Sequence, residues 1–189
     1  MAAMSLTIDA PAFSAALATA GFCVSIVNDI AANRESPEMW QVVAEAKAGY
    51  VCMHMQGTPQ TMQAEPHYDD VLREVGEFFA ERLGTLAEHG VAAGQVALDP
   101  GIGFGKSLKH NLALLSAGRG IAPSKDMPLM WGASRKSMFR DLLGRESSGD
   151  RLPGTLGVAA MAPSKGVDII RVHDVADHAD LYAAMSALG

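Results

Sequence analysis

The residues VALDPGIGFGK, at positions 96–106, carry the clearest architectural signal in this chain. A short apolar run, Val96–Leu98, ends at the carboxylate of Asp99, and glycines then follow at alternate positions. An apolar run without polar alternation is typical of a strand buried on both faces, as in a parallel sheet. Glycines let the backbone turn tightly and approach a ligand closely. The stretch therefore predicts a buried strand whose carboxyl end opens onto a binding loop.

This loop differs from both common phosphate-binding loops. A Walker loop has four residues between its first glycine and the Gly-Lys pair, whereas three residues separate Gly101 from Gly105. A dinucleotide fingerprint has glycine at the position of Lys106. The loop is therefore not expected to bind a nucleotide. The acid before it and Phe104 among small residues favour a flat ligand instead.

The same alternation of short apolar runs and helical patterns extends in both directions along the chain. The expected strands are Leu6–Ile8, Cys23–Val27, Tyr50–Met53, Val96–Leu98, Pro128–Trp131 and Ile169–Val172. The expected helices include Pro37–Ala48 with Ser36 as its N-cap, Asp70–His89 ended by Gly90, and Asp177–Leu188. Pro163 is expected to kink a late helix. Strands that alternate with helices predict βα units and a parallel sheet. No linker divides the chain, so residues 1–189 are expected to form a single α/β domain.

Composition excludes several function classes. Fifteen Lys and Arg residues against 21 Asp and Glu residues give a net charge of −6, which disfavours a dedicated nucleic-acid binder. No run reaches the roughly 18 apolar residues that a transmembrane helix needs. Residues 1–10 lack the basic start of a signal peptide. Cys23 and Cys52 form no C-x-x-C pair, so we expect a cytoplasmic protein without a disulfide framework.

Polar side chains follow each of the six expected strands. They are Asp9, Asn28 with Asp29, His54, Asp99, Ser134 with Arg135 and Lys136, and Arg171 with His173. Function in parallel α/β folds gathers at the carboxyl ends of strands. Asp9 or Asp29 could equally cap the next helix, and Met53 could simply fill the core. The repetition over six strands favours an active face.

Two segments point to an anionic ligand. Ser134-Arg135-Lys136-Ser137 opens a helix, whose free backbone N–H groups attract anions. A solvated basic helix start is the alternative interpretation. In Arg171-Val172-His173-Asp174 the strand alternation places Arg171 and His173 on one side, a pair suited to phosphate or pyrophosphate. No spacing of His, Cys or acidic residues predicts a metal site.

Taken together, these segments resemble the dihydropteroate synthase family. The resemblance is carried by Thr7–Asp9, Val27–Ile30, Met53–Gly57, Asp99–Lys106, Ser134–Ser137 and Ile169–Val175, which occur in the family's order over nearly the whole chain. It implies a TIM-type (β/α)8 barrel. It also implies an enzyme that joins 6-hydroxymethyl-7,8-dihydropterin diphosphate to 4-aminobenzoate, releasing pyrophosphate and forming 7,8-dihydropteroate in folate biosynthesis.

The resemblance also implies roles for individual residues. The pterin would be bound by Asp9, Asn28, Met53, Asp99 and Lys136, the diphosphate by Arg171 and His173 with the help of Mg2+, and 4-aminobenzoate by Phe104 and Ser137. Asp9, Lys136, Arg171 and His173 would be the catalytic residues. Asp9 would lie where cationic charge develops on the pterin, which is where a pocket contributes most to rate. The family further implies a homodimer formed through the late helices.

The family's first two βα units have no counterpart in residues 1–189. The family's first-strand Asn, which is linked to metal and diphosphate, is therefore absent. A loop that helps build the aminobenzoate pocket is absent as well. We therefore expect a barrel of about six βα units that is incomplete at its N-terminus. We also expect low turnover by this chain alone. Two other hypotheses stay open: a pterin-dependent methyltransferase on a related barrel, and a non-catalytic pterin-binding remnant. A methyl donor carries no diphosphate, so Arg171 and His173 favour the synthase.

Overall fold

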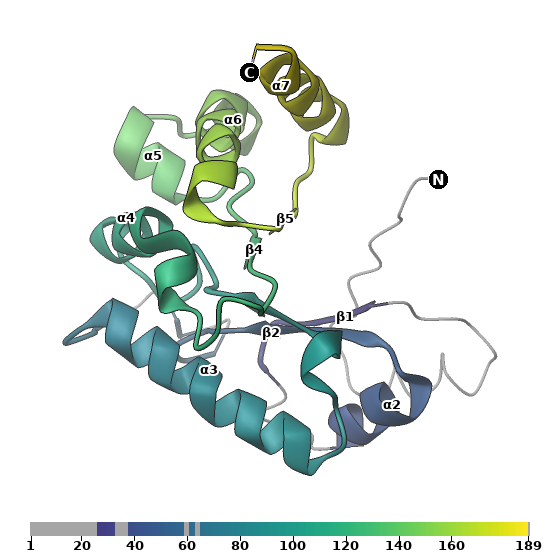
Figure 1. The fold of residues 1–189 in the computed structure, drawn as a ribbon. Helices are drawn as coiled ribbons and strands as arrows, with labels where there is room; N and C mark the ends of the chain where they lie inside the picture. The colour runs from purple at the N-terminus through teal and green to yellow at the C-terminus, as the bar shows by residue number, and fades with distance from the viewer. Residues whose placement is uncertain (1–25, 33–37, 59–60, 63–64, 189) are drawn as a thin grey trace.

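The computed structural model describes residues 26–32, 38–58, 61–62 and 65–188 of the chain (Figure 1). The expected strand Leu6–Ile8, the residue Asp9 and the N-cap Ser36 lie outside the described residues. The described elements alternate in the expected order. The strands are β1 (Ile26–Asp29), β2 (Gly49–Met53), β3 (Val96–Asp99), β4 (Met130–Trp131) and β5 (Ile169–Ile170). The helices are α2 (Glu38–Ala46), α3 (Val71–Glu88), α4 (Leu108–Ala117), α5 (Met138–Leu143), α6 (Leu152–Met161) and α7 (Val175–Leu188), with 3-10 turns η1 (Ala93–Gln95), η2 (Gly118–Ile121), η3 (Ser148–Arg151) and η4 (Pro163–Lys165).

All strand pairings in the described residues are parallel, and strands that follow one another in sequence are neighbours in space. β1, β2 and β3 form one ladder in that order, and β4 pairs with β5. A parallel bridge between Leu98 and Leu129 places β4 beside β3. A doubly wound sheet reverses its strand order at a switch point, whereas this order runs from β1 to β5 without reversal. The fold is therefore α/β with a singly wound parallel arrangement, as an arc of a barrel requires.

Side-chain alternation gives the sheet two chemically different faces. Val27, Tyr50 and Leu98 belong to the apolar core that α3 covers with Val75 and Phe79. Their neighbours along the strands point to the opposite face, because successive strand residues alternate sides. That inner face carries Asn28, Val51, Met53, Ala97 and Asp99. Helices α2 and α3 both lie on one side of the β1–β3 ladder (Figure 1), opposite this inner face.

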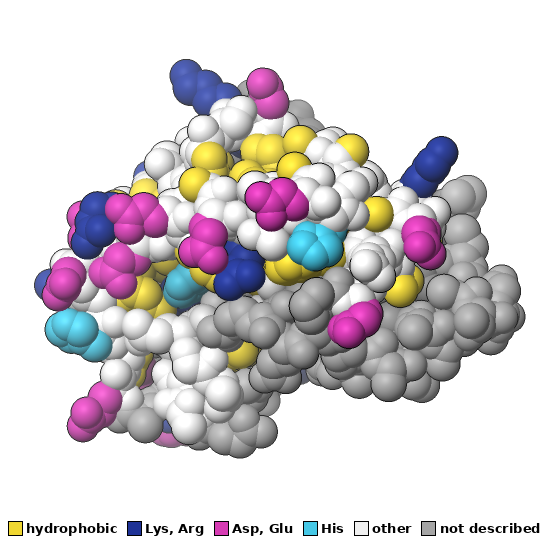
Figure 2. All heavy atoms as spheres, turned by 90° about the horizontal axis from the view of Figure 1, so that it is seen from below, with side chains coloured by type: hydrophobic (Ala, Val, Ile, Leu, Met, Phe, Trp, Pro, Cys, Tyr) yellow, Lys and Arg dark blue, Asp and Glu magenta, His cyan; other side chains and the backbone are white. Residues whose placement is uncertain are grey.

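Helix α3 forms for the reasons that its sequence predicts. The Oδ1 atom of Asp70 accepts hydrogen bonds from the backbone N–H groups of Leu72 and Arg73, at 3.0 and 3.1 Å, and so caps the first turn. One stripe of the helix is buried in the core, with Phe79 fully buried. In the view from below, acidic and basic side chains are interspersed on the described outer surface (Figure 2). The Oδ1 atom of the neighbouring Asp69 lies 3.4 Å from the Nε2 atom of His67.

Several predicted boundaries are wrong by a few residues. The strand expected over Pro128–Trp131 is limited to Met130–Trp131, and the strand expected over Ile169–Val172 ends at Ile170. Pro163 does not kink a helix: α6 ends at Met161 and Pro163 begins the turn η4. Before β4, the carbonyl oxygens of Pro128 and Leu129 still accept backbone hydrogen bonds from Leu98 and from Asp168 and Ile169, but these bonds do not extend the ladder. Within the described residues, no helix is both long and apolar enough to cross a membrane.

Candidate active site

The glycine loop after β3 is in contact with two neighbouring segments. Gly101 has φ +65°, and a Cβ atom there would lie 1.9 Å from the carbonyl oxygen of His54, directly after β2. Gly103 has φ +79°, and a Cβ atom there would lie 3.1 Å from the Cδ atom of Lys136. Both positions need glycine for its backbone conformation and for close approach. The loop therefore brings the end of β2 and Lys136 against the end of β3.

Asp99 is the buried acid of this site. Only 1% of the residue is exposed, and its Oδ1 atom accepts a hydrogen bond from the backbone N–H of Gly101 at 2.8 Å. Burial raises the pKa of its carboxyl group, and the Gly101 N–H and the cations Arg171, Lys136 and Lys106 act in the opposite direction. A carboxylate held among three cations is suited to accept N–H groups from a ligand.

Lys136 and Arg171 lie close to this carboxylate. The Nζ atom of Lys136 lies 3.6 Å from the centroid of the Phe104 ring, a cation–π contact. Burial, followed by repulsion from Arg171, lowers the pKa of Lys136 to about 8, although Asp99 opposes the shift. A Cβ atom on Gly132 would lie 2.8 Å from Nη2 of Arg171 and 3.4 Å from Oδ2 of Asp99. The structure thus brings Asp99, Phe104, Lys136 and Arg171 together, as the sequence predicts.

Asn28 presents a buried amide to the same inner face. Neither its Nδ2 nor its Oδ1 atom has a hydrogen-bond partner within the described part of the chain, although the residue is only 5% exposed. A buried amide without partners costs free energy, so such a group is expected where a ligand completes it. Met53, fully buried, ends the neighbouring strand on this face. The Nε atom of Arg171 is likewise buried and unpartnered within the described part of the chain.

The segment Ser134–Ser137 differs from the expected open anion site. The Oγ atom of Ser134 accepts a hydrogen bond from the backbone N–H of His173 at 3.1 Å and lies 2.9 Å from its ring Nδ1 atom. The guanidinium of Arg135 is paired with Asp174. The Ser134 hydroxyl and the Arg135 guanidinium are thus already paired with other protein groups. Ser137 stands before α5, and its side chain makes no capping hydrogen bond there.

Sequence reasoning did not assign a role to Lys106. Its Nζ atom lies 3.0 Å from Nδ1 of His54 and donates to the carbonyl oxygens of His54 and Phe104, at 3.3 and 3.0 Å. Burial lowers its pKa to about 7, opposed by Asp99. The residue is 3% exposed. A lysine directly after three alternating glycines was the available signal, because a loop so closely packed leaves little room for a solvated side chain.

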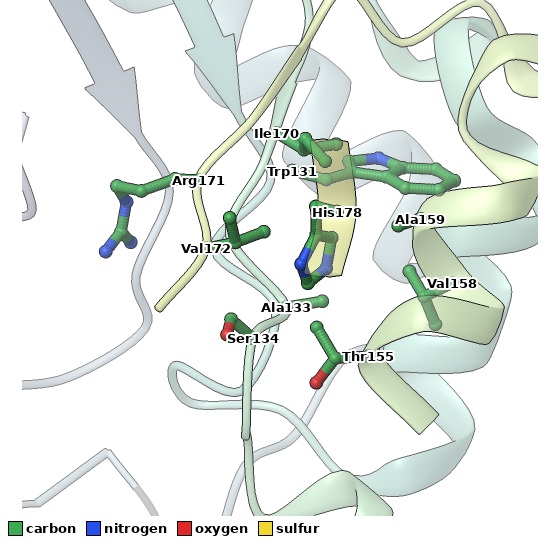
Figure 3. Close-up of a pocket in the computed structure, with 10 residues that line it drawn as sticks. All are labelled: Trp131, Ala133, Ser134, Thr155, Val158, Ala159, Ile170, Arg171, Val172 and His178. Atoms are coloured by element: carbon green, nitrogen blue, oxygen red, sulfur yellow. The ribbon is translucent and has the colours of Figure 1, made fainter. Parts of the chain in front are cut away.

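A small cavity of about 10 Å3 lies on the other side of β4 and β5, between α6 and α7. Figure 3 shows Ile170 and Val172 on the side of His178, while Arg171 points away from them. The strand alternation therefore continues past the end of β5 and directs Arg171 toward Asp99. The cavity is about the size of one water molecule and is far too small for a pterin. It is not the candidate site.

Comparison with known proteins identifies the family. The family model described as pterin binding enzyme matches residues 2–173. The dihydropteroate synthases of Neisseria meningitidis serogroup C and Escherichia coli K12 are 38% and 42% identical to the chain over 174 and 164 residues. These matches cover 92% and 86% of the chain but 61% and 56% of the relatives, so the chain spans about three-fifths of their length.

Solved structures agree with this result. Dihydropteroate synthase from Stenotrophomonas maltophilia superposes with a TM-score of 0.86 at 35% identity, covering 95% of this chain and 66% of that structure. The Burkholderia cenocepacia enzyme complexed with 7,8-dihydropteroate also superposes with a TM-score of 0.86, at 37% identity. That match covers 96% of this chain and 66% of that structure. The chain therefore belongs to the pterin-binding enzyme family.

Proposed function

We propose that this chain carries the pterin and diphosphate half of a dihydropteroate synthase site. The observation that carries the proposal is the buried carboxylate of Asp99, which lies beside Lys136 and Arg171. The same face presents the amide of Asn28, which has no hydrogen-bond partner among the described residues. An amino-pyrimidine edge supplies N–H donors for Asp99 and both donor and acceptor groups for Asn28. The cations suit a ligand that also carries negative charge.

In the proposed reaction, the C–O bond between the pterin methylene and the diphosphate breaks, and the diphosphate leaves with the electron pair. The amine of 4-aminobenzoate then forms a C–N bond to the methylene and loses a proton to water or to the departing diphosphate. Asp99, Asn28 and Lys136 would orient the pterin, and Met53 would contact its face. Asp9, outside the described residues, keeps its proposed role near the developing cation.

Arg171 and His173 would hold the diphosphate as it leaves. The N–H and ring nitrogen of His173 both contact Ser134, which orients the imidazole relative to Lys136. Phe104 and Ser137 would contact 4-aminobenzoate. Because Lys136 lies over the ring of Phe104, the two proposed substrate positions adjoin each other. This proximity is what a condensation requires.

The described residues do not fit a protein-held Mg2+ site. They bring together no group of three His, Cys, Asp or Glu side chains that could hold a metal ion. The side chains proposed for the diphosphate are a guanidinium and an imidazole instead.

The test is calorimetric titration with 6-hydroxymethyl-7,8-dihydropterin diphosphate, followed by a pyrophosphate-release assay with 4-aminobenzoate. Binding of the diphosphate ester supports the proposal. Tighter binding of methyltetrahydrofolate would favour the methyltransferase alternative, and absence of binding to either would refute a pterin site. Binding without turnover would favour the non-catalytic pterin-binding alternative.

We also propose a cytoplasmic homodimer that buries α6. This helix has no charged side chain, yet only Thr155 and Ala159 are buried and Met161 is 52% exposed. A helix that is apolar all round is normally covered. Light scattering after gel filtration should give about twice the 19.8 kDa chain mass, and Met161→Glu should give the monomer. A monomeric parent chain at micromolar concentration would contradict this proposal.

A further inference from the structure

Arg135 has an unusual backbone for its residue type. Its φ is +55°, in the left-handed region that side chains other than glycine and asparagine rarely adopt. Two contacts hold the backbone there. Its N–H donates to Oγ1 of Thr155 at 3.1 Å, and its carbonyl oxygen accepts from Nη1 of Arg151 at 3.0 Å. A strained conformation persists only when its surroundings determine it, and it is often found at functional sites.

The side chain of Arg135 joins the two loops that carry the candidate site. Its Nε atom donates to Oδ2 of Asp174 at 3.0 Å, and its Nη2 atom donates to Oδ1 of the same carboxylate. The partners are 39 residues apart in sequence, and the Asp174 side chain is only 12% exposed. Two parallel bonds from a guanidinium fix both distance and orientation. The hydrogen bond from Arg135 is the largest cause of the lowered pKa of Asp174.

Residues on both sides of this pair are candidates for ligand contact. Lys136 directly follows Arg135 and turns inward over Phe104. His173 directly precedes Asp174 and contacts Ser134. The ion pair therefore lies between the loop proposed to bind the pterin and the loop proposed to bind the diphosphate. Together with the Ser134–His173 contacts, it joins the two loops.

We propose that Arg135 and Asp174 are a positioning pair that holds Lys136 and His173 at the separation required by a ligand spanning both loops. This inference rests on the proposed function and deepens it, because it assigns a role to two residues outside the ligand contacts. A spanning ligand gains from engaging both loops at once only if their geometry allows simultaneous contact. A ligand held by one loop depends much less on the pair.

The experiment compares three titrants on the whole chain by calorimetry. They are 6-hydroxymethyl-7,8-dihydropterin diphosphate, 6-hydroxymethylpterin and inorganic pyrophosphate. Arg135→Met, Asp174→Asn and the double variant should each bind the diphosphate ester about 10-fold or more weakly, and the double variant should be no worse than the singles. Binding of 6-hydroxymethylpterin and of pyrophosphate alone should change by less than about 3-fold.

The matched control is Arg140→Met. Arg140 also pairs with a carboxylate, that of Asp141 at 2.9 Å, but both lie on α5 and join no loops. This variant should bind all three titrants like the parent chain.

Other results would overturn the inference. Equal weakening of all three titrants, additive effects in the double variant, or unchanged binding of the diphosphate ester would each refute it. Unfolding of both single variants in thermal melts would show a purely structural role. If the parent chain fails to bind the diphosphate ester, the proposed function fails and the inference fails with it. If the parent binds and the variants are unaffected, only the inference fails.

Discussion

Asp99 combines deep burial with the nearby cations Lys136 and Arg171, and this combination distinguishes it from an aspartate that caps a helix. Its Gly101 hydrogen bond occupies one oxygen, and Lys136 and Arg171 lower the pKa that burial raises. Asp70 shows the contrast, because both of its N–H partners belong to its own helix. The same residue type therefore serves two purposes, decided by its surroundings.

Asp99→Asn tests the pterin contact. A carboxylate accepts two N–H groups from an amino-pyrimidine, whereas an amide places a donor against one of them. A buried mismatch of this kind costs about 1–3 kcal/mol, or roughly 10- to 100-fold in affinity. Calorimetry with a pterin analogue measures the loss. Asp69→Asn, at an exposed side chain, is the control, and equal affinity of Asp99→Asn and the parent would remove Asp99 from the site.

Lys106 predicts an unusual dependence of stability on pH. Burial lowers its pKa to about 7 from an ordinary value of 10.5, so above pH 7 the unfolded chain binds more protons than the folded chain. The free energy of unfolding should therefore rise between pH 7 and pH 9, by up to about 1.4 kcal/mol per unit. Lys136, whose pKa is lowered to about 8, contributes a further rise in the free energy of unfolding with pH.

Lys106→Met should flatten this rise in urea denaturation measured at pH 7, 8 and 9. Cys52 opposes this rise from about pH 8 upward, because burial raises its pKa from 9.0 to about 12 and the unfolded chain then loses the thiol proton first. An equally steep rise in the Lys106→Met variant would show that Lys106 is charged in the folded chain at all of these pH values.

At the scale of elements, the glycine loop depends on β2 as much as on β3. Gly101 faces the carbonyl oxygen of His54, and the backbone N–H of His54 donates to the carbonyl oxygen of Asp99 at 2.9 Å. The ends of the two strands are thus joined by a backbone hydrogen bond, to which the side chain of Lys106 adds contacts with His54. Side chains that follow these strands are positioned by that junction.

Gly101→Ala should therefore destabilise the chain strongly. A positive φ costs roughly 1–2 kcal/mol for alanine, and a Cβ atom 1.9 Å from a backbone oxygen forces the loop to move. We expect a total loss of at least about 3 kcal/mol in urea denaturation, with pterin binding reduced in parallel. Gly84→Ala, on the exposed surface of α3 with nothing within 4 Å, should instead stabilise by about 0.5–1 kcal/mol. Similar effects at the two positions would contradict the close packing described here.

At the scale of the molecule, the described strands form an arc with two ends. Within the described residues, β1 pairs only with β2 and β5 only with β4. Ile26 on β1 and Ile169 on β5 are 55% and 40% exposed. Unpaired edges and exposed strand residues favour association with further strands.

We expect the 189-residue chain to turn over much more slowly than a full-length relative. The relatives extend beyond the matched region by about two-fifths of their length. Any substrate contacts in that extra length are missing here, and imperfect alignment alone can cost on the order of 100-fold in rate. A pyrophosphate-release assay on this chain and on the Escherichia coli enzyme measures the ratio. Comparable rates would show that the described arc, with residues 1–25, suffices for catalysis.

The alternation of strands and helices, the parallel arrangement of the sheet and the position of the glycine loop follow from the sequence alone. These features depend on local rules: the two-residue period of a strand, the helical stripe of α3, and the restriction of positive φ to glycine. Asp99, Lys136 and Arg171 are predicted to converge for this reason, whereas a site role for Phe104 is predicted only from the family resemblance. Each directly follows a buried strand or lies in the loop after it, and parallel strands deliver their carboxyl ends to one edge.

Only the tertiary structure decided which polar groups are already engaged. From its position, Arg135 was expected to attract an anion, but its charge is paired with Asp174, and Ser134 contacts His173 rather than standing open. The structure also shows Lys106 buried and the Asn28 amide unpartnered among the described residues. These facts depend on contacts between segments 39 or more residues apart, such as Arg135 with Asp174 and Lys106 with His54. Local periodicity places a side chain on a face, whereas the partner that it meets is determined by how the strand ends and loops come together in space.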